Sequence, residues 1–323
     1  MICLTLTRPC RRLICLVGLA VAAGLARAAE PDSIPIVVDT DIGTDIDDAF
    51  ALALMVRSPE FHVLGVTTVS GDTAARVRLA AKLLWVAGGA WREVPVYAGT
   101  PGPAQTIGQA PWAKNFTSPA LHLSGAVEFL RAEINAAPGQ VTVVALGELT
   151  NLAALFRSDP RIAHKIKSIV LMGGSVEHGY RPGSKPVAEW NIKSNIPAAR
   201  AVFAASVPLL VAPVDSTVGL RLEESDRTKI FGQWDPLAQA LKQLYALWLP
   251  GDQYNHGTPI LYDALPIGLL VDERLAVILP RNLKVDAAGF TIVAPAGKES
   301  HCRVAMSADP EKFSDFLMSR LAP

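Results

Sequence analysis

The sequence predicts an α/β fold: an open, mostly parallel, Rossmann-like sheet that is flanked by helices. Short apolar runs rich in β-branched residues alternate with segments of helical periodicity along the chain. Strands that are buried on both faces have such continuous apolar sequences. The sequence has no internal repeat, long linker or low-complexity tract. We therefore expect residues 29–323 to form a single domain.

The expected elements follow one another as strand, helix and strand. Six strands are expected, at 34–39, 63–69, 94–99, 141–147, 166–174 and 207–215. Helices are expected between them, at 73–87, 149–157 and 196–206. This alternation favours parallel strands joined by crossover helices. Residues 100–118, rich in Pro, Gly and Gln, are expected to form one long surface loop.

The first 28 residues are predicted to be a cleaved signal peptide and not part of the fold. Three arginines precede an apolar run at 13–26, and Ala26 and Ala28 have the spacing that signal peptidase prefers. An uncleaved membrane anchor is the alternative, but this run of 14 residues is shorter than the roughly 20 that span a bilayer. We therefore expect an exported protein, periplasmic or secreted, without stable membrane association.

The composition of the mature chain argues against nucleic-acid binding and excludes an internal disulfide. Loss of residues 1–28 removes four arginines and no acidic residue, which leaves 26 basic and 30 acidic residues and a net charge of −4. Such a charge gives no basis for nucleic-acid binding. Cys302 is the only cysteine that remains, so an internal disulfide is excluded.

Five aspartates follow the first expected strand within ten positions: Asp39, Asp41, Asp45, Asp47 and Asp48. At the effective dielectric of a protein surface, each close pair of like charges costs on the order of 1 to 4 kcal/mol. The carboxyl ends of parallel strands form the ligand-binding edge of an open sheet. Further polar residues are expected at this edge: Ser70–Asp72, Gly147–Asn151, Gly173–Asn191, Asp215 and Tyr262–Asp263.

This set of side chains favours a hard divalent cation bound through oxygen. Carboxylate, hydroxyl, amide and carbonyl oxygens suit calcium or magnesium, whereas zinc prefers histidine and cysteine. A purely structural calcium loop, or a helix start capped by Asp47 or Asp48, is the alternative. An EF-hand loop is disfavoured because Thr44 and Phe50 occupy the positions of its glycine and glutamate, counted from Asp39.

Residues 39–52, DTDIGTDIDDAFAL, resemble the opening motif of the inosine/uridine-preferring nucleoside hydrolases, a D-x-D-P-G-x-D-D-A pattern after the first strand. Five further motifs follow in the order of the family: GVTTVSGD (65–72), ALGELTNLA (145–153), IVLMGG (169–174), AEWN (188–191) and YDALP (262–266). Together they cover nearly the whole mature chain. The resemblance implies an N-ribosyl hydrolase that cleaves ribonucleosides into free base and ribose, with calcium (Ca2+) as cofactor.

The resemblance also implies the metal ligands, which are Asp41, Asp48, the backbone carbonyl of Leu146, and Asp263. The same calcium would bind the ribose 2′ and 3′ hydroxyls and the attacking water, and Asp41 would accept the proton of that water as general base. The anomeric carbon would become oxocarbenium-like in the transition state, which nearby carboxylates stabilise.

A second group of residues is implied to bind the substrate. Asp47 would accept a hydrogen bond from the 2′ hydroxyl of the ribose. Glu189 and Asn191 would hold the 5′ and 3′ hydroxyls, and Met172 would pack beneath the sugar. Trp190 is a candidate to stack on the base.

The sequence departs from the family pattern in the opening motif and after the second strand. Two extra residues precede the Asp47–Asp48 pair, so a register anchored on Asp41 would make Asp45 the ribose ligand instead of Asp47. We anchor on the pair because the helix start fixes its position. Asp72, where many members carry Asn, is either a further carboxylate of the pocket or the cap of the helix at 73–87.

The acid that protonates the leaving base is the largest departure. Tyr262 stands where members often have a histidine, and the ordinary pKa of a tyrosine is about 10. Tyr262, His256, His178 and Tyr180 are the candidates for this role. The base preference is therefore left open.

Two other classes of protein are alternatives to the hydrolase. The motif of a D-x-D phosphatase has Thr or Val two residues after the second aspartate, but Gly43 occupies that position here. A non-catalytic nucleoside- or ribose-binding protein would keep the sugar pocket without turnover. Oligomers are common in the nucleoside hydrolase family, so a homo-oligomer is a further expectation, although the sequence identifies no interface.

Overall fold

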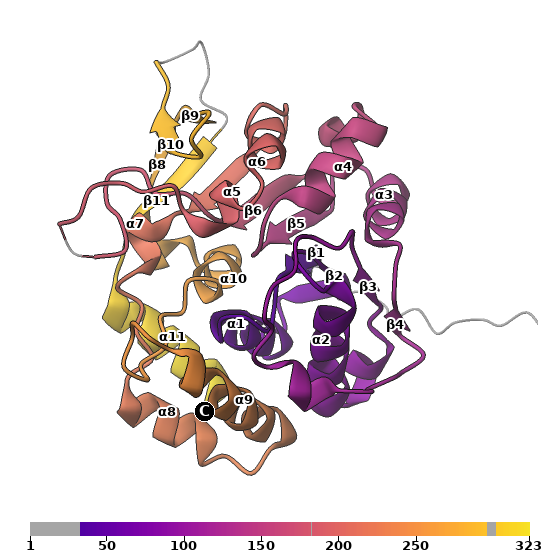
Figure 1. Cartoon of the computed structure of the whole chain (residues 1–323), viewed down its shortest axis with the longest axis vertical. Helices are drawn as coiled ribbons and strands as arrows, with labels where there is room; N and C mark the ends of the chain where they lie inside the picture. Colours follow the sequence, from indigo (N-terminus) through magenta and orange to yellow (C-terminus); the bar gives the residue numbers. More distant parts are fainter. Residues whose placement is uncertain (1–32, 182, 296–301) are drawn as a thin grey trace, which may run out of the picture.

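The computed structural model describes residues 33–181, 183–295 and 302–323 (Figure 1). The predicted signal peptide, residues 1–28, lies outside these ranges, and N-terminal sequencing of the mature protein would test its cleavage. Among the described residues, no helix is both long enough and apolar enough to cross a membrane.

A nine-stranded sheet forms the centre of the molecule, in the order β4-β3-β2-β1-β5-β6-β7-β11-β8 (Figure 1). Its strands are β1 (Ile34–Thr40), β2 (Phe61–Thr68), β3 (Val96–Ala98), β4 (Leu121–His122), β5 (Thr142–Ala145), β6 (Ser168–Met172), β7 (Leu209–Ala212), β8 (Ala276–Arg281) and β11 (Cys302–Ala308). Neighbouring strands are parallel except β11 and β8, which pair antiparallel. The short strands β9 (Leu283–Val285) and β10 (Thr291–Val293) form a separate antiparallel pair. The predicted open, mostly parallel sheet is confirmed, and the six expected strands are present as β1, β2, β3, β5, β6 and β7.

Helices cover both faces of this sheet (Figure 1). They are α1 (Asp47–Val56), α2 (Thr73–Ala87), α3 (Ala126–Ala136), α4 (Thr150–Ser158), α5 (Trp190–Lys193), α6 (Ile196–Phe203), α7 (Val214–Thr217), α8 (Glu224–Phe231), α9 (Pro236–Trp248), α10 (Ala264–Val271) and α11 (Pro310–Leu321). Short 3-10 segments are η1 (Gly89–Glu93), η2 (Ala110–Ala113), η3 (Ile162–Lys165), η4 (Leu249–Gly251) and η5 (Glu273–Leu275). The helices predicted from periodicity are confirmed as α2, α4 and α6.

Two apolar cores lie on opposite faces of the sheet. Ile36 and Val38 of β1 belong to the core beneath α1, α2, α9, α10 and α11, whereas Val37 belongs to the core beneath α3, α4 and α6. This alternation follows from the two-residue period of a strand. Because β1 is apolar at each of these positions, it is buried on both faces and lies in the middle of the fold.

The strand order reverses at β1, which lies between β2 and β5. From this point β2, β3 and β4 follow outward on one side, and β5, β6 and β7 on the other. Such a reversal leaves a crevice at the carboxyl ends of the two central strands. The acidic segment that follows β1 therefore starts in this crevice.

Residues 100–118 are not only a surface loop, as was expected. Ile107 and Gln109 of this segment are buried. The backbone N–H of Gln109 donates to the carbonyl of Gly43 at 3.1 Å, and its side-chain Nε2 donates to the carbonyl of Asp45 at 2.5 Å. The segment therefore packs against the acidic turn and supports it.

Candidate active site

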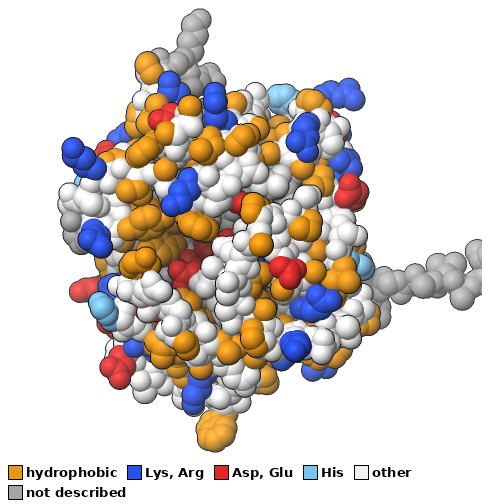
Figure 2. Space-filling model, in the orientation of Figure 1, with side chains coloured by type: hydrophobic (Ala, Val, Ile, Leu, Met, Phe, Trp, Pro, Cys, Tyr) orange, Lys and Arg blue, Asp and Glu red, His pale blue; other side chains and the backbone are white. Residues whose placement is uncertain are grey.

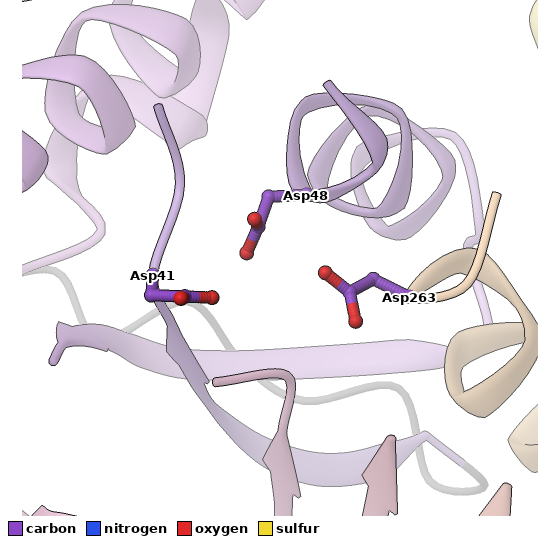
Figure 3. A group of neighbouring side chains, drawn as sticks. All are labelled: Asp41, Asp48 and Asp263. Carbon is purple, nitrogen blue, oxygen red and sulfur yellow. The ribbon is translucent and has the colours of Figure 1, made fainter. Parts of the chain in front are cut away.

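Three aspartates from separate parts of the chain meet in the crevice. Asp41 follows β1, Asp48 lies in the first turn of α1, and Asp263 immediately precedes α10 (Figure 3). Their exposed fractions are 8%, 2% and 3%, and one carboxylate oxygen of each lies within 4.8 Å of the others. Figure 2 shows acidic side chains at the floor of a hollow on this face of the molecule.

Local structure places each of the three carboxylates. A Cβ on Gly147 would lie 2.9 Å from Oδ1 of Asp41, so only glycine lets the turn after β5 approach this side chain so closely. The hydroxyl of Thr40 donates to Oδ1 of Asp48. Asp263 is the N-cap residue of α10, but its side chain makes no capping hydrogen bond. Its carboxylate is therefore not used by the helix.

Burial raises the pKa of each carboxyl in this group. The pKa of Asp41 rises to about 6, chiefly through burial, although the nearby Arg76 opposes the rise. The pKa values of Asp48 and Asp263 lie well above the ordinary value because of burial and the charges of neighbouring aspartates. The ionised carboxylates therefore destabilise the metal-free protein, and a bound cation would offset that cost.

The donor set fits a hard divalent cation. Three buried carboxylates converge on one point, and the group contains no histidine or cysteine. Oxygen ligands of this kind favour calcium or magnesium over zinc. The site could therefore hold a metal through Asp41, Asp48 and Asp263.

Asp47 has the buried position expected of the ribose ligand, and Asp45 does not. Asp47 is 5% exposed, and its pKa is raised well above the ordinary value by burial and by the charges of Asp45, Asp48 and Asp41. Asp45 is only partly buried, and its carboxylate accepts a hydrogen bond from the backbone N–H of Ile46 at 2.7 Å. The choice of Asp47 over Asp45 as the ribose ligand stays a prediction.

Asn191 holds the backbone carbonyl that the resemblance assigns to the metal. Its Nδ2 donates to the carbonyl of Leu146 at 2.8 Å and to that of Met172 at 3.2 Å. Met172 is 3% exposed at the end of β6, with its sulfur 3.5 Å from the same nitrogen. A carbonyl oxygen has two lone pairs, so the carbonyl of Leu146 retains one for a cation. Asn191 therefore orients both Leu146 and Met172.

Glu189 is the N-cap of α5. Its Oε1 accepts from the backbone N–H of Asn191 at 3.0 Å, and its Oε2 accepts from those of Gly174 at 2.9 Å and Ile192 at 3.2 Å. The hydroxyl of Tyr180 donates to Oε1 over a longer distance, 3.5 Å. A sugar hydroxyl at Glu189 would therefore compete with Tyr180 and not with the backbone donors.

The candidates for the leaving-group acid divide into two kinds. Tyr262 is partly buried, and its ring meets that of Tyr180 edge to face with centroids 6.1 Å apart. Burial and the charges of nearby aspartates raise the pKa of Tyr262 further above its ordinary value, so its hydroxyl is a neutral hydrogen-bond donor. His256 and His178 are exposed, and the backbone of His256 is left-handed, with φ 51°.

Two predicted binding residues are exposed. Trp190 is 48% exposed, with Nζ of Lys193 5.1 Å from its ring centroid. Asp72 is exposed and accepts the backbone N–H of Ala75 at 3.0 Å as the N-cap of α2. Of the two roles considered for Asp72, the structure shows the helix cap. Contacts of Trp190 and Asp72 with substrate stay predictions.

Asp39 has a role that differs from that of the other aspartates and that its sequence position did not indicate. It is 1% exposed, and its Oδ1 accepts from Oγ1 of Thr67 at 2.7 Å and from Nδ2 of Asn151 at 2.8 Å. Asp39 therefore ties β1, β2 and α4 together beneath the crevice. A D-x-D phosphatase needs this first carboxylate as an accessible nucleophile, so its burial argues against that alternative.

Comparison with known proteins gives one consistent result. The family model described as inosine-uridine preferring nucleoside hydrolase matches residues 36–315. Uridine nucleosidase 1 of Arabidopsis thaliana is 31% identical over 80% of each chain, and the pyrimidine-specific ribonucleoside hydrolase RihA of Salmonella arizonae is 29% identical over 90% of this chain and 98% of its own. The solved structure of a plant nucleoside hydrolase, PpNRh1, has the same fold, with a TM-score of 0.75, 23% identity, and coverage of 90% of this chain and 99% of its own.

Proposed function

Because the chain belongs to the inosine-uridine preferring nucleoside hydrolase family and is a nucleosidase that hydrolyses the N-glycosidic bond of ribonucleosides, we propose that calcium is its cofactor and that the reaction passes through an oxocarbenium-like transition state. The convergence of Asp41, Asp48 and Asp263 in one buried group carries this proposal. We further propose uridine and related pyrimidine ribonucleosides as substrates, which the names of the two sequence relatives support.

Each residue of the site has a part in this reaction. The bound cation would orient the ribose diol and lower the pKa of the attacking water. Asp41 would accept the proton of that water. The close approach of Gly147 to its carboxylate supports this role. Asp47, buried in the same turn, would accept a hydrogen bond from the 2′ hydroxyl. The same carboxylates would stabilise the positive charge that develops on the sugar.

Release of free base from the common ribonucleosides tests the proposed function. The purified protein with calcium is expected to release uracil from uridine. It is also expected to cleave p-nitrophenyl riboside, whose leaving group needs no proton. If it hydrolyses neither this compound nor any common ribonucleoside, the chain is a binding protein and the proposed function is wrong.

Replacing Tyr262 with phenylalanine is expected to slow hydrolysis of uridine but not of p-nitrophenyl riboside. Loss of one hydrogen bond to a leaving base should reduce kcat/KM for uridine by about 10- to 100-fold. With p-nitrophenyl riboside, kcat/KM should change by less than about threefold, because that leaving group departs without such help. Steady-state kinetics on both substrates measures the difference.

The chain offers matched controls for this change. Tyr254 is 80% exposed, so Tyr254→Phe removes a hydroxyl on the surface and should leave both rates unchanged. His256→Ala tests one of the two imidazole candidates in the same assay. An equal loss on both substrates in Tyr262→Phe would show that Tyr262 supports the pocket and does not assist the leaving base.

A further inference from the structure

Arg76 is a fully buried cation beside the acidic group. It lies in α2, is 0% exposed, and is the largest fully buried side chain in the part of the chain that the structure describes. The five N–H donors of its guanidinium have five acceptors. Nε donates to the carbonyl of Ser70 at 2.8 Å, one terminal nitrogen donates to the carbonyls of Asp41 and Ile42, the latter at 3.0 Å, and the other donates to Oγ1 of Thr44 at 2.9 Å and Oε1 of Gln105 at 2.7 Å.

These acceptors belong to three segments that are far apart in the sequence. Three of them lie in the turn between β1 and α1, one follows β2, and one lies in the segment 100–118. The turn between β1 and α1 is the one that has two extra residues relative to the family motif. A longer turn has more conformations to lose, and Arg76 fixes this one at both the backbone and the side chain.

The turn after β2 is also held by this guanidinium. Ser70 and Gly71 both have left-handed backbones, with φ 73° and 55°, and a residue other than glycine seldom adopts this conformation. The carbonyl of Ser70 accepts from Nε of Arg76, and its hydroxyl lies 3.4 Å from Oε1 of Gln105. Arg76 therefore stabilises two turns at once, and both border the crevice.

The acceptors of Arg76 are neutral oxygens. Among the described residues, no salt bridge includes Arg76. A buried charge is costly unless hydrogen bonds and nearby opposite charge compensate for it. Here the complete set of hydrogen bonds and the neighbouring aspartates provide that compensation, and the pKa of Asp41, raised chiefly by burial, is lowered in part by Arg76.

We propose that Arg76 is a positioning residue for metal binding: its guanidinium holds the backbone of Asp41 so that the carboxylate meets those of Asp48 and Asp263. This inference rests on the proposed metal dependence. Arg76 has two opposed effects on a bound cation. Its charge repels the cation, whereas its hydrogen bonds hold the ligands in place before binding. We infer that the second effect is larger.

The direction in which Arg76→Met changes the Kd for calcium separates these two effects. Arg76→Met removes both the charge and the hydrogen bonds. If charge dominated, the metal-free variant would bind calcium more tightly than the wild type in titration calorimetry. We expect weaker binding instead, with the Kd raised at least tenfold.

Two further variants keep the test decisive if Arg76→Met does not fold. Arg76→Lys retains the charge but has at most three donors, and its Kd for calcium should rise about 10- to 100-fold. Thr44 is exposed, so Thr44→Val removes one acceptor of Arg76 without disturbing the core, and its Kd should rise by a smaller factor. Arg78→Lys is the matched control, because Arg78 lies on the same helix but donates to the carbonyl of Ala74 at 2.7 Å, within α2 itself.

The outcomes distinguish this inference from the proposed function. A Kd of Arg76→Lys within twofold of the wild-type value, or tighter binding by Arg76→Met, would overturn the role of Arg76 alone. A wild-type protein that binds no calcium would overturn the proposed function, and the role of Arg76 with it. Weaker binding by Arg76→Lys and Thr44→Val, with Arg78→Lys unchanged, supports the positioning role.

Discussion

Replacing Asp41 with asparagine is expected to reduce kcat for ribonucleoside hydrolysis by about a thousandfold or more. The amide has the size of the carboxylate but cannot accept the proton of the attacking water. It also removes one negative charge from the group that is proposed to hold the metal. Steady-state release of uracil from uridine measures the loss.

The same variant is expected to stay folded. Burial raises the pKa of Asp41 to about 6, so the ionised carboxylate is a cost to the metal-free fold that a neutral amide removes. The melting temperature of Asp41→Asn in chelator should therefore equal or exceed that of the wild type. This result separates a chemical role of Asp41 from a structural one.

Asp45→Asn is the matched control, because Asp45 lies in the same turn but outside the three-carboxylate group. Its kcat should fall by less than about tenfold, as expected for a partly buried group with no catalytic contact. Equal inactivation of both variants would favour the alternative register, in which Asp45 contacts the ribose. More than a tenth of the wild-type activity in Asp41→Asn would exclude Asp41 as the general base.

Removal of divalent ions is expected to abolish hydrolysis, and added calcium is expected to restore it. The three buried carboxylates repel one another without a cation, so the fold should also lose stability in chelator. At a calcium concentration of 100 times Kd, binding contributes about 2.7 kcal/mol of stability. Activity that persists after dialysis against chelator would contradict the proposed cofactor.

This stabilisation by calcium is expected to increase with pH. Burial raises the pKa of Asp41 to about 6, and those of Asp48 and Asp263 lie well above the ordinary value for the same cause. In the metal-free protein, these raised pKa values stabilise the folded state at a pH below the pKa values of the unfolded chain. That stabilisation is lost as the pH rises through the pKa values of the folded state. Calcium binds the ionised carboxylates, so its effect has the opposite trend.

Thermal unfolding at pH 5 and pH 7.5, each with calcium and with chelator, measures this dependence. The difference in melting temperature between calcium and chelator should be larger at pH 7.5. A larger difference at pH 5 would show that the carboxylates of this group are not the ligands. Asp41→Asn should reduce the difference at both pH values, because the variant lacks one ionisable ligand.

The sequence alone predicted the parts of the site that depend on local pattern. The apolar run of β1 and the aspartates behind it placed Asp41 and Asp48 at one edge of the sheet, and the position of α2 was predicted with the correct bounds. Asp263 was expected at the same edge, but it could be assigned as a metal ligand only through the family motif, because it lies more than two hundred residues further along the chain. The structure adds that it meets the other two.

Other features depend on contacts that no local pattern encodes. Arg76 lies in a helix with other charged residues, so its sequence context does not distinguish a buried arginine from an exposed one. The partners of Asp39 are Thr67 and Asn151, which only the sheet topology brings to it. The antiparallel pair β8 and β11 was not predicted, because β8 lies at the edge of the sheet and lacks a continuous buried run.

The network around Asp39 has a consequence for changing the substrate range of this enzyme. The carboxylate of Asp39 joins two strands and a helix next to the acidic turn, so altering these contacts would disturb catalysis on every nucleoside alike. The exposed segments near His178 and His256 are held instead through backbone N–H groups, which donate to Asp215 and Asp252. Libraries of variants that are meant to accept new bases should therefore vary the side chains of these outer segments and leave Asp39 and its partners unchanged.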